Sequence, residues 1–355
     1  MSATLQQPPS APVAPLPTSP RGSLLKAELH RFRARRFIQV LAGIGVLGWA
    51  LAVVIGLLNF GNPTAADYAD AQAQVDQILA ENNHFREQCL EDPEAVTGGV
   101  VPEGLSPEEI CGPELTEQDI GGVEAFLTKA PFDLEDAGTA GATAFAGLAS
   151  ALAFVIGATW IGAEWSTRSI VALLFWAPRR LRVMGTKLTV LVAGTTVFGV
   201  AAQVGWLTMA GILDAAVGTD EALPDGFWST LLQTQARGVL LVVLAAVLGF
   251  GLTSIVRNTG AALGIAFVYV VVVQLVLGNM KPSWAPWMLG TNAVGLVNEG
   301  GLTLYFYDQV DYSTDNFGEP VSYYLGHLQA GLFLGAVAVV LIGLGTWLFA
   351  RRDIH

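Results

Sequence analysis

Charged residues are scarce in this sequence. Only 14% of its 355 residues are Asp, Glu, Lys or Arg, whereas 52% are hydrophobic. Soluble globular domains typically carry about 25% charged residues. The composition therefore excludes an ordinary soluble domain and favours an integral membrane protein.

Acidic residues are missing from the interiors of the long apolar runs. Glu164 and Asp214 stand only at the ends of such runs. Ion-coupled carriers usually bind their driving ion through ionisable groups inside the membrane. A carrier driven by protons or sodium ions is therefore disfavoured.

Signatures of nucleotide binding and catalysis are also missing. No G-x-x-x-x-G-K-[ST] loop is present to cradle phosphates, and the nearest piece is the tripeptide at 185–187. There is no G-x-S-x-G or H-E-x-x-H, and the four histidines are scattered. We expect no catalytic, cofactor-binding or metal site and no nucleic-acid partner, so energy for work on a substrate must come from another chain.

Only two cysteines occur, Cys89 and Cys111, and both lie in the acidic stretch 61–137. In an oxidising exterior we expect them to form a disulfide, which would close a loop of about 22 residues and stabilise it by about 3 kcal/mol. The alternative, a metal site completed by His84, lacks any standard zinc spacing. The stretch holds 18 acidic and two basic residues, which indicates either a solvated surface or attraction of a cationic substrate.

Six apolar runs are present, each long enough at about 19 to 27 residues to cross a bilayer as a helix. They predict an all-α integral membrane protein with six transmembrane helices, in which the Ala- and Gly-rich second run is buried among the others. The runs cover residues 37–60, 138–161, 188–213, 238–256, 259–277 and 328–349.

Basic residues gather at alternate connections between these runs. With the N-terminus inside, the inner segments hold 14 of the 18 basic residues but only three of the 30 acidic ones. The positive-inside rule therefore predicts that both termini are cytoplasmic and that 61–137 is an acidic extracellular insertion. The first run is too long for a signal-peptide core and follows an Arg-rich flank, as in an uncleaved anchor. Arg greatly outnumbers Lys, which indicates a GC-rich bacterial genome and hence a bacterial cell membrane.

The remaining segments differ in composition. Residues 1–21 are rich in Pro, Ser and Gln, which predicts a disordered cytoplasmic tail. In 22–36, Leu25, Leu29 and Phe32 recur at helical spacing among basic residues, which predicts an amphipathic helix along the inner leaflet, or alternatively a solvated start to the first span. Residues 279–327 form a second extracellular segment, and 350–355 a cytoplasmic tail.

Three polar residues lie within or beside the apolar runs. Gln203 and Gln274 either line a substrate path or form hydrogen bonds between helices. Arg237 lines the path if its helix enters the membrane early, and otherwise its side chain snorkels to the interface.

The cytoplasmic connection 162–187 has the sequence GAEWSTRSIVALLFWAPRRLRVMGTK. Ser166 or Thr167 can cap a helix whose apolar stripe is Ile170, Leu173 and Leu174 and which ends at Pro178. The alternative is an ordinary inner loop whose arginines only satisfy the positive-inside rule.

The order of these residues resembles the ABC transporter type-2 permease family. There an acidic-aromatic pair and a hydroxyl cluster lead into an apolar helix, a Pro, an Arg and a Lys that opens the third span. Arg168 departs from the Gly that is frequent in the family. The matching residues are Glu164, Ser166, Thr167, Leu173, Leu174, Pro178, Arg180 and Lys187.

The resemblance implies that 162–187 is the coupling helix that sits on an ATPase subunit, which would press on Ile170, Leu173 and Leu174. The chain would then be the permease subunit of an exporter. It would pair in the lipid bilayer with a second copy or a related chain, and with cytoplasmic P-loop ATPases that hold ATP and magnesium. Two alternatives stay open: a membrane-anchored sensor or scaffold with an acidic extracellular ligand-binding domain, and an intramembrane enzyme.

Overall fold

The computed structural model describes residues 24–93, 106–167, 169–170, 175, 179–219, 221–311 and 319–351. The expected tail at 1–21 lies outside these residues. So do Leu173, Leu174 and Pro178 of the predicted coupling helix.

Six helices in the described part are long and apolar enough to cross a membrane, as the sequence predicted. Several extend beyond the apolar runs into the more polar residues that flank them. The spans are α2 (Arg36–Asn59), α6 (Leu134–Ser166), α8 (Arg180–Val217), α9 (Phe227–Val256), the continuous Thr259–Met280, and α13 (His327–Arg351).

Helices α6 and α9 form the centre of the bundle. A Cβ added to Gly157 of α6 would lie 1.9 Å from the carbonyl oxygen of Ala246. One added to Gly249 of α9 would lie 2.3 Å from the carbonyl oxygen of Phe154. Glycine thus lets the two backbones touch. Half of the apolar window of each helix is buried, against 11% for α2, which confirms the predicted burial of the second run.

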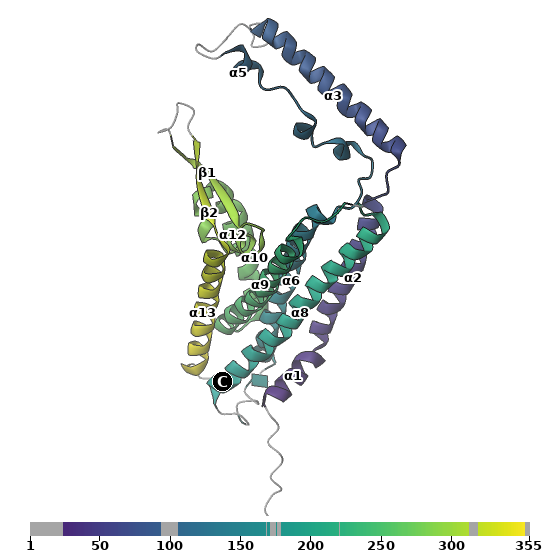
Figure 1. Cartoon of the computed structure of the whole chain (residues 1–355). Helices are drawn as coiled ribbons and strands as arrows, with labels where there is room; N and C mark the ends of the chain where they lie inside the picture. Colours follow the sequence, from purple (N-terminus) through teal and green to yellow (C-terminus); the bar gives the residue numbers. More distant parts are fainter. Residues whose placement is uncertain are drawn as a thin grey trace, which may run out of the picture.

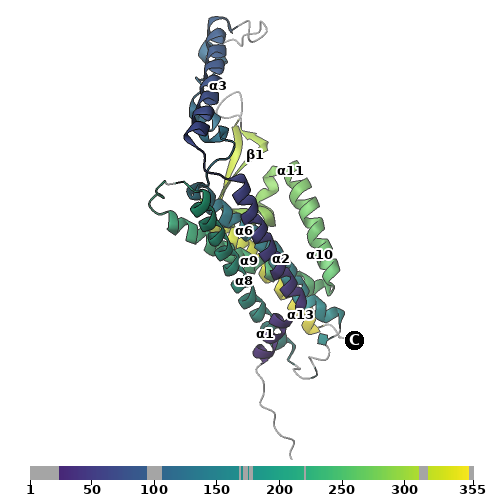
Figure 2. The ribbon, with the colours of Figure 1, turned by 90° about the vertical axis from the view of Figure 1, so that its right-hand side faces the viewer.

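The fifth span is built from α10 (Thr259–Val268), the π-helical η3 (Tyr269–Leu277) and α11 (Gly278–Met280). It stands to one side of the bundle in Figure 2, and only 6% of its apolar window is buried. This span therefore offers most of its surface to lipid or to another chain.

Helix α1 (Leu24–Ala34) lies at one end of the bundle, beside the first residues of α8 (Figure 1). Glu28 and Phe32 are buried, whereas Leu25 and Leu29 are exposed. The predicted apolar stripe is therefore divided: Phe32 packs on the protein, and the two leucines are available to a membrane surface.

The acidic arm, which we define as the described residues 61–93 and 106–133, projects from the opposite end of the bundle (Figure 1). Its elements are α3 (Ala65–Glu91), α5 (Pro107–Cys111), η1 (Glu117–Ile120) and η2 (Val123–Phe126). Phe132 anchors its base: the Phe132 amide donates to the carbonyl of Val217 (2.7 Å), and the Thr219 amide donates to the carbonyl of Phe132 (3.1 Å).

The described chain is mostly helical, as expected, and it also contains a β-hairpin. The hairpin follows η4 (Pro282–Trp287) and α12 (Leu289–Val297) and consists of β1 (Leu302–Asp311) and β2 (Glu319–Leu325), which pair antiparallel. Phe306 is buried, whereas Tyr305 and Tyr307 are exposed. This alternation and the aromatic content are strand signals, which the search for long apolar runs did not detect.

Candidate functional site

The connection 162–187 begins and ends in buried charges. Lys187, in the second turn of α8, is 0% exposed, and Glu164, near the end of α6, is 5% exposed. The Lys187 Nζ lies 2.6 Å from Oε1 of Glu164 and 2.7 Å from Oε2 of Glu28. One ammonium group therefore joins α1, α6 and α8.

Trp160 and Arg35 complete this group. The Arg35 guanidinium lies 4.5 Å and the Lys187 Nζ 5.0 Å from the centre of a Trp160 ring, within the range of cation–π attraction. Trp160 Nε1 donates to the carbonyl of Lys187 at 3.2 Å. We call Glu28, Arg35, Trp160, Glu164 and Lys187 the Lys187 cluster.

The cluster contains two carboxylates and two cations, so its charges are paired inside the protein. Arg35 donates to the carbonyl of Thr159 (3.0 Å) and lies 3.5 Å from Glu164. Burial lowers the pKa of Arg35, while the charges of Glu164 and Glu28 act in the opposite direction. Separating a buried ion pair leaves a buried charge without its partner, which is costly. The paired charges therefore hold α1, α6 and α8 in one arrangement.

A second set of contacts fastens the same connection to the last helix. Arg180 Nη1 donates to the carbonyls of Phe349 and Ala350, both at 3.2 Å, at the C-terminal end of α13. A cation is favourable there because the end of a helix carries partial negative charge. The Trp165 ring packs edge-on against Phe349 at 5.7 Å, and Arg257 lies 4.4 Å over Trp165.

The middle of the connection contains both buried and exposed residues. Ile170 is 1% exposed and belongs to the main hydrophobic core. Ser166 and Thr167 are exposed, and their hydroxyls donate to the carbonyl of Ala163 (3.0 and 2.8 Å), which satisfies the end of α6. Phe175 is 84% exposed.

The predicted path residues form contacts within the chain. Gln203 donates from α8 to the carbonyl of Ala142 in α6 (3.1 Å). The Gln274 amide donates to the Thr291 hydroxyl (3.3 Å) and accepts from the Gly290 amide (3.1 Å). Both form the bonds between elements that the sequence offered as the alternative to lining a path.

Arg237 lies well inside its helix, because α9 begins ten residues earlier, at Phe227. It is half-buried and donates to the Thr234 hydroxyl at 3.0 Å, and its Nε is buried without a hydrogen-bond partner. Its role in a path stays a prediction.

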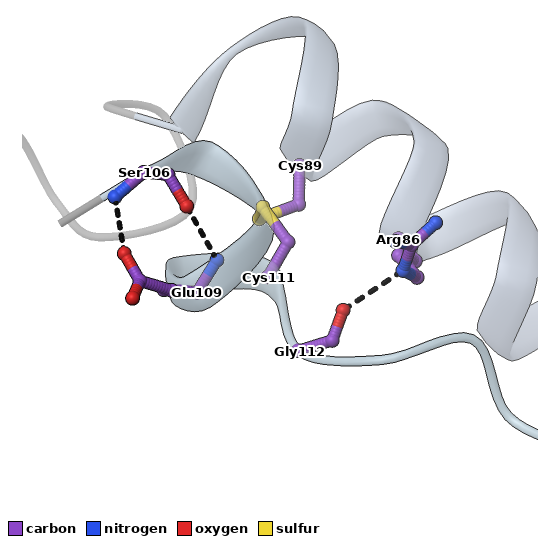
Figure 3. Close-up of a disulfide and its surroundings, with 6 residues drawn as sticks. All are labelled: Arg86, Cys89, Ser106, Glu109, Cys111 and Gly112. Atoms are coloured by element: carbon purple, nitrogen blue, oxygen red, sulfur yellow. Dashed lines mark hydrogen bonds between the residues drawn. A yellow bond between two sulfur atoms is a disulfide. The ribbon is translucent and has the colours of Figure 1, made fainter.

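Cys89 and Cys111 form a disulfide that links α3 to α5 (Figure 3). Beside it, Arg86 Nε donates to the carbonyl of Gly112 at 2.9 Å. The disulfide engages both thiols, so the alternative metal site with His84 is wrong. In the part of the chain that the structure describes, no group of three or more His, Cys, Asp or Glu side chains could hold a metal ion.

Three cluster members were missed at the level of sequence: Glu28, Arg35 and Trp160. Glu28 offered one signal, as an acid in an otherwise basic segment. A single carboxylate among basic residues can indicate that it pairs with a buried cation. Its pairing with Lys187 spans 159 residues, and no local pattern predicts which cation that is.

A family model described as ABC-2 family transporter protein matches residues 25–354. No curated protein and no solved structure matches the chain significantly. The matched range includes α1, all six spans and the acidic arm.

Proposed function

This chain belongs to the ABC-2 transporter family, and from that premise we propose that it is the permease subunit of an exporter. Membership of the family implies partnership with an ATP-binding subunit in a bilayer. Two copies, or two related chains, would enclose the substrate path. Separate P-loop ATPases, which bind ATP and magnesium, would supply the energy.

The anchoring of the connection 162–187 at both of its ends supports its assignment as the ATPase contact. Lys187 and Glu164 fasten it to α1 and α6, and Arg180 fastens it to α13. A push on a segment held in this way is transmitted to several helices together. The exposed ring of Phe175 is the surface that we assign to the partner.

The predicted coupling residues thus take two roles in this proposal. Glu164, Ile170 and Lys187 are buried, and they transmit force within the chain. Ser166 and Thr167 are exposed and face the ATPase, together with Phe175, which the sequence did not single out. Leu173, Leu174 and Pro178 keep the contact roles that the family resemblance implies.

The proposed topology places α1 and the connection 162–187 in the cytoplasm of a bacterial cell and the acidic arm outside its membrane. The positive-inside rule supports this orientation. So does the fold, because the basic segments and the acidic arm lie at opposite ends of the bundle (Figure 1). A disulfide in the arm fits an oxidising exterior.

Replacing Phe175 by Asp tests the contact. The chain would be co-expressed with a candidate P-loop ATPase from the same genome, and co-purification and ATP turnover would be measured. Because an exposed aromatic at the centre of an interface contributes about 2 kcal/mol or more, we expect recovery of the ATPase to fall at least about tenfold. Phe85→Asp is the matched control, because Phe85 is 58% exposed but lies in the acidic arm.

Co-purification that survives Phe175→Asp, together with Leu173→Asp and Leu174→Asp, would overturn the assignment of the coupling surface. Full function in cells that lack the ATPase would instead favour a sensor or scaffold.

A further inference from the structure

A cavity of about 430 Å³ lies beside the Lys187 cluster and shares Arg35 with it. Its walls come from three elements that are distant in sequence: the first residues of α2, the end of α6 and the first residue of α10. Thr259 starts α10 directly against α6, where a Cβ added to Gly162 would lie 2.0 Å from the Thr259 hydroxyl oxygen. Close packing at this point leaves the cavity between α10 and the start of α2.

The lining of the cavity combines cationic, hydroxyl and apolar groups. Arg35 and Arg36 supply positive charge, Phe37, Ile38 and Ala163 supply apolar surface, and the hydroxyl residues are Thr159, Ser166, Thr167 and Thr259. Arg35 already bonds Thr159 and lies near Glu164. Arg36 is exposed, and within the described residues no hydrogen bond or ion pair holds it. One guanidinium group at the mouth of the cavity is therefore available to a ligand.

The position of Arg36 matches the depth of a lipid headgroup. It is the first residue of α2, whose 24 residues extend about 36 Å and therefore cross the hydrocarbon layer. The exposed Leu25 and Leu29 of α1 lie just before it and can contact the same membrane surface. The cavity thus opens where phosphate groups of the bilayer are found, with its apolar residues on the helix that enters the hydrocarbon.

We propose that this cavity binds the phosphate headgroup of an anionic phospholipid from the leaflet at that end of the bundle. The Arg36 guanidinium matches phosphate oxygens in a bidentate geometry, and Arg35 adds positive potential. Phe37 and Ile38 contact the glycerol and the first methylene groups. Basic pockets between transmembrane helices bind anionic headgroups in this manner.

Native mass spectrometry of the full chain in detergent tests the proposal, with phosphatidylglycerol and phosphatidylcholine added in parallel. We expect Arg36→Gln to weaken phosphatidylglycerol binding by about tenfold, the value for one charge-assisted contact. Arg33→Gln is the matched control, because it removes the same charge from an exposed position on α1 that does not line the cavity. It should change binding less than about twofold.

Ala163→Leu provides an independent test, because it fills the cavity without altering charge. We expect it to weaken phosphatidylglycerol binding while the thermal midpoint stays near that of the parent chain. In the last measurement, inorganic phosphate is added at millimolar concentration, and we expect it not to displace the lipid.

Three results would each overturn the proposal. Equal losses in Arg36→Gln and Arg33→Gln would indicate diffuse attraction to the basic surface. Displacement by inorganic phosphate would identify a site for a soluble anion. Equal binding of phosphatidylcholine would show that the negative charge of the lipid is not recognised.

Discussion

The Lys187 cluster and the acidic arm lie at opposite ends of the bundle and use charged residues in opposite ways. In the cluster, Lys187 and Glu28 are buried, and the bond between them joins segments 159 residues apart. In the arm, Asp67, Glu109 and Asp119 are exposed, and each bonds a hydroxyl residue only three positions away. Longer-range contacts there include the Cys89–Cys111 disulfide and the hydrogen bond from Arg86 to Gly112.

The difference shows how the surroundings decide what a charge contributes. An exposed ion pair contributes little because water screens it, whereas a buried pair couples its two partners strongly. The cluster can therefore fix the arrangement of α1, α6 and α8 with a single lysine. The arm, which has a small core around residues such as Val75 of α3, needs a covalent bond for the same purpose.

The largest expected effect follows from removing the buried cation. Lys187→Met leaves Glu28 and Glu164 buried without their ammonium partner, so we expect the free energy of unfolding to fall by about 3–5 kcal/mol. Denaturant unfolding in detergent, followed by tryptophan fluorescence, measures it. Lys129→Met is the matched control, because Lys129 is exposed in the arm, and it should cost less than about 0.5 kcal/mol.

Adding Glu28→Gln and Glu164→Gln to Lys187→Met should recover part of the loss, since the uncompensated charges are then removed. If the single Lys187 variant unfolded like the Lys129 control, the contrast between the two ends of the bundle would be wrong.

Much of this contrast could be predicted from the sequence, but not its most important contact. Length and hydropathy were enough for six spans, and two cysteines on one acidic stretch were enough for the disulfide. The resemblance drew attention to Glu164 and Lys187, but as residues that meet a partner. Their burial depends on α1 folding back over α8, which is a tertiary event without a local signal.

The hairpin and Phe175 illustrate the same limit. The strands were hidden because a search for long apolar runs does not detect short alternating segments of Tyr and Leu. Phe175 stands in an apolar run with Leu173 and Leu174, and spacing alone could not say that Ile170 is buried while Phe175 is exposed.

A smaller effect is expected from breaking the disulfide. Replacing Cys89 and Cys111 by Ser should destabilise the arm by about 3 kcal/mol, because the unfolded loop regains its conformational freedom. Hydrogen exchange followed by mass spectrometry should become faster in α3 and α5 and remain unchanged in α6 and α9.

Arg86→Gln, which removes only the bond to Gly112, should lower the stability of the arm by about 1 kcal/mol. Faster exchange throughout α6 and α9 would show that the arm and the bundle unfold together.

The smallest expected effect is that of acidic pH on the stability of the helix ends in the arm. Hydrogen bonds from Thr64, Ser106 and Thr116 lower the pKa of Asp67, Glu109 and Asp119, respectively. A carboxylate whose pKa is lower in the folded state stabilises that state fully above its ordinary pKa of about 4. This contribution is lost as the pH falls through the lower, folded value. We therefore expect hydrogen exchange at the first turns of α3, α5 and η1, corrected for the intrinsic effect of pH, to become faster below about pH 4. Asp67→Asn removes the titrating group from α3, so exchange at the start of α3 alone should no longer respond to acid. A response that persists there would mean that acid acts on the arm through groups other than its helix caps.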